Sequence, residues 1–171
     1  VAAAAASAAL ACAACHGSAA PPQLVPVPKL ARQRQSYVFR AMLAYRDGQR
    51  TDPQMAPLMQ GLSDQRMRDL AAAVAGTMLD RPPPLRDDLP GFVQASRDCL
   101  WCHGETGIGE FEGMPVLAGQ DAAYLASALA AYRAGTRTDP TMRAVAAELS
   151  DGEIGQLAQF FAGHQWLERG P

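Results

Sequence analysis

The sequence predicts an all-α protein built as two tandem domains of the same design. Three observations lead to this fold class. The chain repeats itself at a constant offset of 87 residues. Apolar residues in both copies recur at the three- and four-residue steps that are typical of helices. No stretch alternates apolar and polar residues as a half-buried strand does.

The repeat covers most of the chain. Adding 87 to each number aligns residues 12–76 with residues 99–163 without a gap, and 26 of the 65 aligned positions are identical. The segment Tyr45–Met55 recurs as Tyr132–Met142 with nearly the same residues. Such self-similarity is the mark of a duplicated structural unit.

The expected boundaries follow from the repeat. We predict an N-terminal domain over residues 1–80, a linker over 81–87 and a C-terminal domain over 88–171. Pro82, Pro83 and Pro84 lie in the linker, and consecutive prolines disfavour a helix and stiffen the chain. A domain of about 80 residues buries little apolar surface by itself, so a buried apolar cofactor would supply part of each core.

Each copy is expected to begin with a helix that leads into a cysteine motif. The segment 92–96 predicts this helix in the second copy, and the alanine-rich segment 2–11 takes the matching place in the first. A second helix follows, and Gly48 and Gly135 are predicted to end it in the two copies as C′ residues.

The last helix of each copy is predicted to begin after a serine N-cap, Ser63 or Ser150. Ser150 with Glu153 has the spacing of a capping box. The predicted apolar stripes are Met67, Leu70, Ala71 and Val74 in the first copy and Ile154, Leu157, Ala158 and Phe161 in the second.

The cysteine motif has the pattern Cys-x-x-Cys-His in both copies. It consists of Cys12, Cys15 and His16 in the first copy and of Cys99, Cys102 and His103 in the second. Two thiols one helical turn apart can each add to a vinyl group of a porphyrin, and the adjacent histidine can then bind the iron. A zinc half-site, a redox dithiol and a disulfide are the alternatives. The motifs therefore predict two covalently bound haem c groups.

A methionine recurs in each copy at the same place. The chain has seven methionines, and most methionines fill cores. Met42 and Met67 lie on helical apolar stripes. Only Met55 and Met142 are matched by the 87-residue offset, and both follow Asp-Pro in what we expect to be an irregular loop.

The order of these elements resembles a class I cytochrome c domain, and the tandem pair resembles the cytochrome c4 family of dihaem electron carriers. The resemblance depends on the two haem motifs, on the Gly-x-Arg…Met segments and on Pro28–Ala31 and Pro115–Gln120. The first copy departs from the family's Leu-Ala-Gly-Gln pattern, because Arg32 stands where the glycine is expected.

The resemblance implies the iron ligands. His16 and Met55 would bind one iron, and His103 and Met142 the other, a ligand pair that raises the reduction potential. A ligating histidine usually donates its other ring N–H to a fixed acceptor. The backbone carbonyls of Pro28 and Pro115 take this role in the implied arrangement.

Four further residues are candidates for contact with the haems. Arg50 and Arg137 either pair with haem propionates or are solvated loop charges. Tyr45 and Tyr132 are expected to pack against haem or core. His164 has no counterpart in the first copy and is expected at the surface.

The predicted function is single-electron transfer between redox partner proteins, membrane-bound respiratory complexes among them. The alternatives are the electron-accepting subunit of a periplasmic dehydrogenase and a haem enzyme of the peroxidase or thiosulfate-oxidising kind. We expect an exported, periplasmic protein without its signal peptide, because haem is attached to this motif outside the cytoplasm. The apolar N-terminal segment is too short to span a bilayer.

The two halves of the chain differ in net charge. Residues 1–87 hold ten Lys and Arg against six Asp and Glu, whereas residues 88–171 hold five against eleven. This dipole should orient encounters with redox partners. The acidic pI of about 5.9 and the lack of a basic stripe with aromatics speak against nucleic-acid binding.

Overall fold

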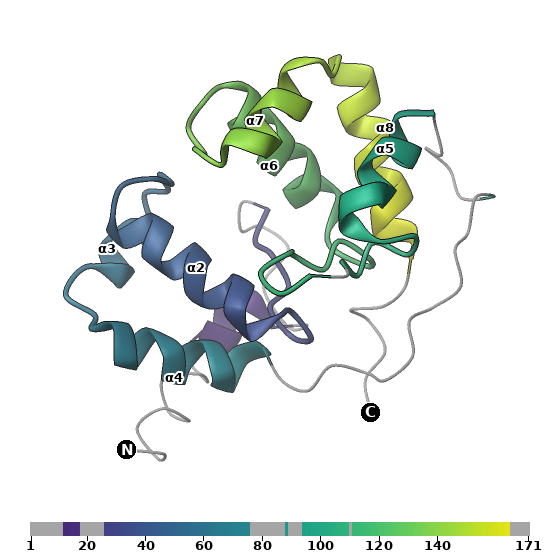
Figure 1. Ribbon diagram of the computed structural model, residues 1–171. Helices are drawn as coiled ribbons and strands as arrows, with labels where there is room; N and C mark the ends of the chain where they lie inside the picture. Colours follow the sequence, from purple (N-terminus) through teal and green to yellow (C-terminus); the bar gives the residue numbers. More distant parts are fainter. Residues whose placement is uncertain (1–11, 18–25, 76–87, 89–93, 110, 165–171) are drawn as a thin grey trace.

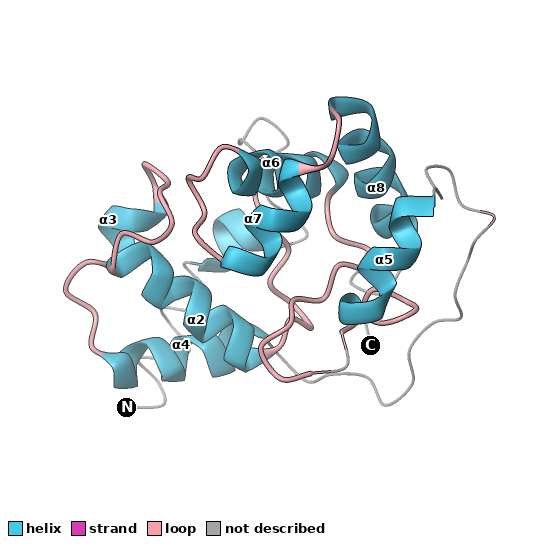
Figure 2. Cartoon of the chain, turned by 45° about the horizontal axis from the view of Figure 1, so that its top comes forward, coloured by secondary structure: helices cyan, strands magenta, loops and turns pink. Residues whose placement is uncertain are grey.

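The computed structural model shows a helical protein, in agreement with the predicted fold class (Figure 2). The structure describes residues 12–17, 26–75, 88, 94–109 and 111–164. Within these residues the β contact is a single isolated antiparallel bridge between Arg50 and Arg137. The expected N-terminal helix over 2–11 and the linker over 81–87 lie outside the described residues.

The helices of the two halves match each other under the 87-residue offset. Residues 12–16 are helical. The remaining helices of the first half are α2 (Gln35–Arg46), α3 (Met55–Met59) and α4 (Asp64–Ala75). Those of the second half are α5 (Gln94–His103), α6 (Ala122–Arg133), α7 (Pro140–Ala147) and α8 (Asp151–Gly163). Figure 1 shows the first set in purple, blue and dark teal, and the second in teal, green and yellow, on two sides of the molecule.

Helices pack on one another only within each half in the described part of the chain. Helix α2 lies against α3 and α4, α6 lies against α7 and α8, and α5 lies against α8. The chain is therefore arranged as two helical units.

The predicted helix ends are confirmed. Gly48 and Gly135 are the C′ residues after α2 and α6, with φ of 72° and 79°, a conformation that glycine adopts without strain. Ser63 accepts a hydrogen bond from the backbone N–H of Arg66 at the start of α4. Ser150 and Glu153 form the predicted capping box at the start of α8.

Each half has its own buried apolar cluster, and each cluster includes residues of the predicted stripe of the last helix. Ile154 and Leu157 of the second stripe are buried as well, outside the largest cluster of that half. The first cluster consists of Val38, Met42, Tyr45, Met59, Met67, Leu70, Ala71 and Ala75. The largest cluster of the second half consists of Leu125, Ala158, Phe160 and Phe161. Phe160 is fully buried although it lies beside the predicted stripe.

The two halves meet through reciprocal glutamine contacts. The side-chain amide of Gln33 donates to the backbone carbonyl of Val116 (2.6 Å) and accepts from the backbone N–H of the same residue (2.9 Å). The Gln120 amide makes the same two bonds to the backbone of Lys29, at 3.0 and 2.8 Å. Because Gln33 and Lys29 are the 87-residue equivalents of Gln120 and Val116, the interface has an approximate two-fold symmetry.

Candidate functional site

The two cysteine motifs lie on helices in the structure. Residues 12–16 form one helical turn, and α5 ends at His103. Residues three and four apart share a face of a helix, so the two thiols and the imidazole of each motif lie on one side. None of the four motif cysteines forms a disulfide in the described structure. A Cβ on Gly17, which follows the first motif, would lie 2.5 Å from the carbonyl oxygen of Ala13, so the chain leaves this motif through a glycine.

The imidazole of His16 is oriented by a backbone carbonyl. Its Nδ1 lies 2.8 Å from the carbonyl oxygen of Pro28. Burial lowers the pKa of His16, and the Pro28 carbonyl opposes this shift. The ring is therefore neutral at pH 7, and a proton on Nδ1 leaves the lone pair of Nε2 free to bind a metal.

The second imidazole has the same surroundings with one difference. His103 is buried, and burial lowers its pKa, while the Pro115 carbonyl and then the charge of Asp139 raise it. The Pro115 oxygen is close enough for this electrostatic effect, but Nδ1 of His103 has no partner that meets hydrogen-bond geometry in the described structure.

Met55 and Met142 lie in short helices and not in the irregular loops that we expected. Met55 is the first residue of α3, and Met142 lies in the first turn of α7. The carboxylates of Asp52 and Asp139 accept hydrogen bonds from the backbone N–H groups of Met55 (2.8 Å) and Met142 (2.9 Å). Asp139 is the N-cap of α7. The N-cap of α3 is Gln54, and the Asp52 side chain accepts from the backbone N–H groups of Gln54 and Met55 at this end of the helix. Both aspartates thus bind N–H groups that lack a partner within the helix.

The methionine segments lie near the histidines of their own halves. The charge of Asp52 raises the pKa of His16, as Asp139 does for His103, although burial has the larger and opposite effect in both. The charge of the aspartate in each methionine segment thus acts on the histidine of its own half.

Arg50 and Arg137 are not solvated loop charges. Arg137 is 8% exposed and Arg50 is half-buried. Each guanidinium lies over the ring of the tyrosine five residues earlier, at 4.5 Å from the centroid of Tyr45 and 4.3 Å from that of Tyr132. Tyr45 belongs to the apolar core of the first half, as predicted, and the rings of Tyr45 and Tyr132 each also pack against an arginine.

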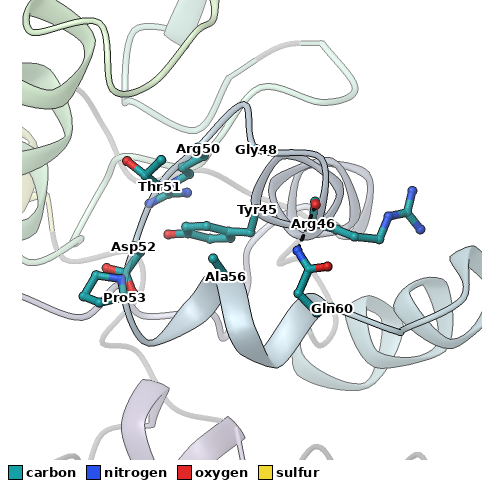
Figure 3. Close-up of a pocket in the computed structure, with 9 residues that line it drawn as sticks. All are labelled: Tyr45, Arg46, Gly48, Arg50, Thr51, Asp52, Pro53, Ala56 and Gln60. Atoms are coloured by element: carbon teal, nitrogen blue, oxygen red, sulfur yellow. Dashed lines mark hydrogen bonds between the residues drawn. The ribbon is translucent and has the colours of Figure 1, made fainter.

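A surface pocket of about 400 Å³ adjoins the first of these pairs. Tyr45 and the chain from Arg50 to Pro53 line it, together with Ala56 and Gln60 of the helix that Met55 begins (Figure 3). The Gln60 side chain donates to the backbone carbonyl of Arg46 and so joins this helix to the end of α2. Polar side chains, among them Arg50 and Asp52, therefore line a hollow beside the segment that holds Met55.

Two features differ from the sequence-based expectation. His164, expected at the surface, is 2% exposed, and its Nδ1 lies 2.9 Å from the carbonyl oxygen of Phe160. It is buried because it is the C-cap residue of α8 and its ring packs against Phe160.

Tyr37 and Tyr124 were not assigned a role, yet their hydroxyls accept hydrogen bonds from Arg137 and Arg50. The sequence did carry one signal for them, because the 87-residue offset places a tyrosine at the same position of both copies.

The residues present fit a haem with its propionates. Arg50 and Arg137 form no ion pair within the described residues, where their polar partners are tyrosine hydroxyls. Buried charges in proteins are usually paired, so these guanidiniums suit carboxylates that the chain does not supply. No three His, Cys, Asp or Glu side chains of the described part converge as ligands of one metal ion, as a zinc site would require.

Comparison with known proteins gives the family. No family model matches the chain. It is 33% identical to the cytochrome c4 of Pseudomonas aeruginosa over 89% of this chain and 83% of that protein. The chain belongs to the cytochrome c4 family. The chain is also 35% identical to the thiosulfate dehydrogenase electron acceptor of Stutzerimonas stutzeri, over 95% of this chain and 83% of that protein.

Solved structures agree with this family. The reduced recombinant cytochrome c4 of Pseudomonas stutzeri matches with a TM-score of 0.74 at 30% identity, over 96% of this chain and 98% of that one. A thiosulfate dehydrogenase of Marichromatium purpuratum matches with a TM-score of 0.70 at 29% identity, over 88% of this chain and 36% of that one. The tandem class I cytochrome c fold, the two covalent haem c groups and the role of dihaem electron carrier are thereby confirmed. No helix of the described residues is long and apolar enough to cross a membrane.

Proposed function

We propose that each helical half holds one haem c through its own motif and its own methionine. The first set is Cys12, Cys15, His16 and Met55, and the second is Cys99, Cys102, His103 and Met142. The observation that carries this proposal is the repeated arrangement of the two halves. In each, an aspartate side chain binds the backbone N–H of the methionine in a short helix, and the charge of that aspartate acts on the histidine of the same half. This histidine is half-buried in the first half and buried in the second. We extend the proposal to two domains with the boundaries predicted above.

The protein groups around each site favour the reduced, ferrous state of a bound haem iron. When bound, the haem iron supplies a one-electron Fe(III)/Fe(II) couple. A methionine thioether raises the reduction potential relative to harder ligands. The positive charges of Arg50 and Arg137 act in the same direction if they lie beside the propionates, because a nearby cation stabilises the less positive iron. The carbonyl of Pro28 orients His16, and that of Pro115 would do so for His103.

We further propose that this cytochrome accepts electrons from a dehydrogenase outside the cytoplasm and passes them to a second redox protein. The similarity to a thiosulfate dehydrogenase electron acceptor over nearly the whole chain supports a dehydrogenase as the electron donor. The excess of acidic residues in residues 88–171 suits a donor with a basic docking face.

The ligand assignment is tested by spectroscopy of single variants. In the wild-type holoprotein, both ferric haems should be low-spin and show the weak near-infrared sulfur-to-iron band. Met55→Ala and Met142→Ala should each remove half of this band and make one ferrous haem accessible to carbon monoxide. Met59→Leu is the matched control, because Met59 is a buried core residue of α3 and leucine conserves its volume.

Two results would contradict the proposal. One is ready binding of carbon monoxide to both ferrous haems of the wild type, which would indicate an open coordination position and support a haem enzyme. The other is loss of the near-infrared band in Met59→Leu.

The donor is tested by rapid mixing with purified thiosulfate dehydrogenase and thiosulfate. We expect this cytochrome to be reduced many times faster than by thiosulfate alone, with a rate that falls as salt rises. Absence of any enzyme-dependent reduction would exclude this donor and leave the carrier role intact.

A further inference from the structure

Trp101 is the most exposed large apolar residue in the described part of the chain, at 85%. It lies on α5 between the two cysteines of the second motif. Its neighbours Cys99 and Leu100 pack against the apolar cluster of the second half, and His103 is buried. Successive helical residues are rotated by about 100°, so Trp101 lies on the face of α5 opposite Cys99 and His103. Its place on the helix therefore exposes it to solvent.

Neither the helix nor the cysteine motif requires an aromatic residue at this position. The 87-residue offset pairs Trp101 with Ala14, which is also exposed. The first motif is thus complete with a methyl group where the second has an indole. Tryptophan is among the residues that contribute most to the binding energy of protein interfaces, because it buries a large, rigid surface. An exposed tryptophan outside the core of its own half suits the role of an anchor for another protein.

Trp101 also lies next to the proposed haem attachment. It is bonded to Cys102 and lies two residues from Cys99, and these are the residues that the proposed function assigns to the haem of this half. Their thiols would join the vinyl groups at one edge of the porphyrin. Electrons pass between proteins over short distances, so a partner has to approach a haem edge. A protein that covers Trp101 is thereby brought to the edge of this haem.

The turn that follows α5 contains a negative charge. Gly104 has φ of 78°, and the backbone N–H of Gly107 donates to its carbonyl (2.9 Å), so the chain turns as soon as the helix ends. Glu105 lies in this turn, four residues after Trp101, and is exposed. The offset pairs it with the uncharged Ser18, and residues 88–171 hold five Lys and Arg against eleven Asp and Glu. The second half thus combines an apolar anchor with acidic charge.

We propose that Trp101 anchors the second half to its electron donor, a dehydrogenase whose docking face has an apolar pocket rimmed by Lys and Arg. The indole fills the pocket, and the acidic charge of the half, with that of Glu105, faces the basic rim. Protein interfaces commonly have an apolar centre and a polar rim, and rim charges set the association rate. This inference depends on the proposed donor and on the proposed haem attachment.

A second copy of the chain suits this surface less well than a basic donor. Contacts between two copies usually follow a two-fold axis and use the same surface of both. Such a contact through Trp101 would place one acidic half against another, and like charges across an interface oppose binding. The charge of residues 88–171 therefore favours a different, basic partner.

The test measures reduction of the holoprotein by purified thiosulfate dehydrogenase and thiosulfate at increasing cytochrome concentration. Trp101→Ala should raise the KM for the cytochrome by about tenfold or more, as loss of an interface anchor does, and leave kcat unchanged. Trp101→Phe keeps an aromatic ring and should raise the KM less. Glu105→Gln should raise the KM by about two- to threefold at low salt and by less at high salt, because exposed charges are screened.

The chain supplies matched controls. Trp101→Ala gives the second motif the residue that the first has as Ala14, so both haems should remain attached and keep their near-infrared bands. Leu58→Ala removes another apolar side chain, which is 64% exposed on α3 of the first half, and should leave the KM unchanged. In a Trp101→Ala background, Ala14→Trp should not restore a low KM, because the first half has an excess of basic residues and Ser18 in place of Glu105.

The inference would be overturned by an unchanged KM in Trp101→Ala, by an equal rise in Leu58→Ala, or by restoration through Ala14→Trp. A wild-type dimer in sedimentation that Trp101→Ala dissociates would identify a second copy as the occupant and would also overturn it. If the dehydrogenase does not reduce the wild type, the proposed donor fails and this inference fails with it. If the wild type is reduced and Trp101→Ala behaves identically, only the anchor fails, and the proposed donor and haem ligands stand.

Discussion

Arg32 and Gly119 occupy equivalent positions in the two halves and share the same left-handed backbone conformation, with φ of 64° and 73°. Arg32 is the only residue other than glycine with positive φ among the described residues. The backbone N–H groups of both donate to the last helix of their own halves, to Ala75 and Phe161. The turn is thus required by the packing of each half, and Arg32 adopts it against the preference of its side chain.

Replacing Arg32 by glycine should therefore stabilise the protein. A residue with a Cβ in this conformation costs about 1–2 kcal/mol, part of which the larger chain entropy of unfolded glycine offsets. We expect Arg32→Gly to raise the free energy of unfolding by about 0.5–1 kcal/mol in a denaturant titration of the holoprotein. Gly119→Ala is the reciprocal variant and should lower it. A destabilising Arg32→Gly would show that contacts of the Arg32 side chain outweigh the backbone strain.

The reciprocal glutamines should contribute strongly to stability. Gln33→Leu leaves the buried N–H and C=O of Val116 without partners, and each unsatisfied group costs about 1–3 kcal/mol. We expect a loss of about 3 kcal/mol in the free energy of unfolding, and a similar loss for Gln120→Leu. Gln35→Leu, at an exposed position at the start of α2, is the control and should change stability by less than about 0.5 kcal/mol. Equal effects of Gln33→Leu and Gln35→Leu would contradict the prediction.

Two glycines of the second half should respond to alanine in opposite directions. Gly155 lies within α8, and a Cβ there would meet nothing within 4 Å. Gly155→Ala should raise the thermal midpoint through a gain of about 0.5–1 kcal/mol in helix propensity. Gly107 has φ of +73°, and a Cβ would lie 2.8 Å from the ring of Phe161. Gly107→Ala should lower the midpoint, since it adds both strain and a clash.

The capping box predicts a pH dependence of stability. Hydrogen bonds from the Ser150 hydroxyl and then the Ser150 backbone N–H hold the pKa of Glu153 below its ordinary value of 4.5. A carboxyl whose pKa is lower in the folded state stabilises the fold above its unfolded pKa and loses this effect as the pH falls through the folded value. The stability advantage of the wild type over Glu153→Gln should thus be constant from pH 7 to about 5 and shrink below 4.5. Unfolding titrations of both proteins across this range measure it, and an advantage that grows toward acid pH would contradict it.

Local sequence patterns predicted most of the secondary structure correctly. Gly48, Gly135 and the Ser150–Glu153 pair act within one or two helical turns, so their effects can be predicted from neighbouring residues alone. The methionine segments were predicted less well, because Met55 and Met142 lie in short helices, whose first N–H groups bind Asp52 and Asp139, where an irregular loop was expected.

The candidate site was predicted in part. The thiols and histidines follow from a five-residue motif, and the methionines from the repeat. The family resemblance pointed to the Pro28 carbonyl, which lies at hydrogen-bond distance from His16, whereas His103 lacks such a bond. The surroundings of Arg50 and Arg137 could not be predicted, because their partners lie 74 and 100 residues away in the chain.

The sequence by itself determined the repeat, the helical fold class, the two haem motifs and the family, since each of these depends on residues close together in the chain or on a constant offset. Only the tertiary structure decided how the halves meet. Gln33 and Gln120 bind each other's half, and Arg50 and Arg137 donate to tyrosine hydroxyls of the opposite half. His164 lies in the core. These contacts depend on the approximate two-fold arrangement of the halves. No local pattern encodes that arrangement, because it arises when two already shaped surfaces pack together.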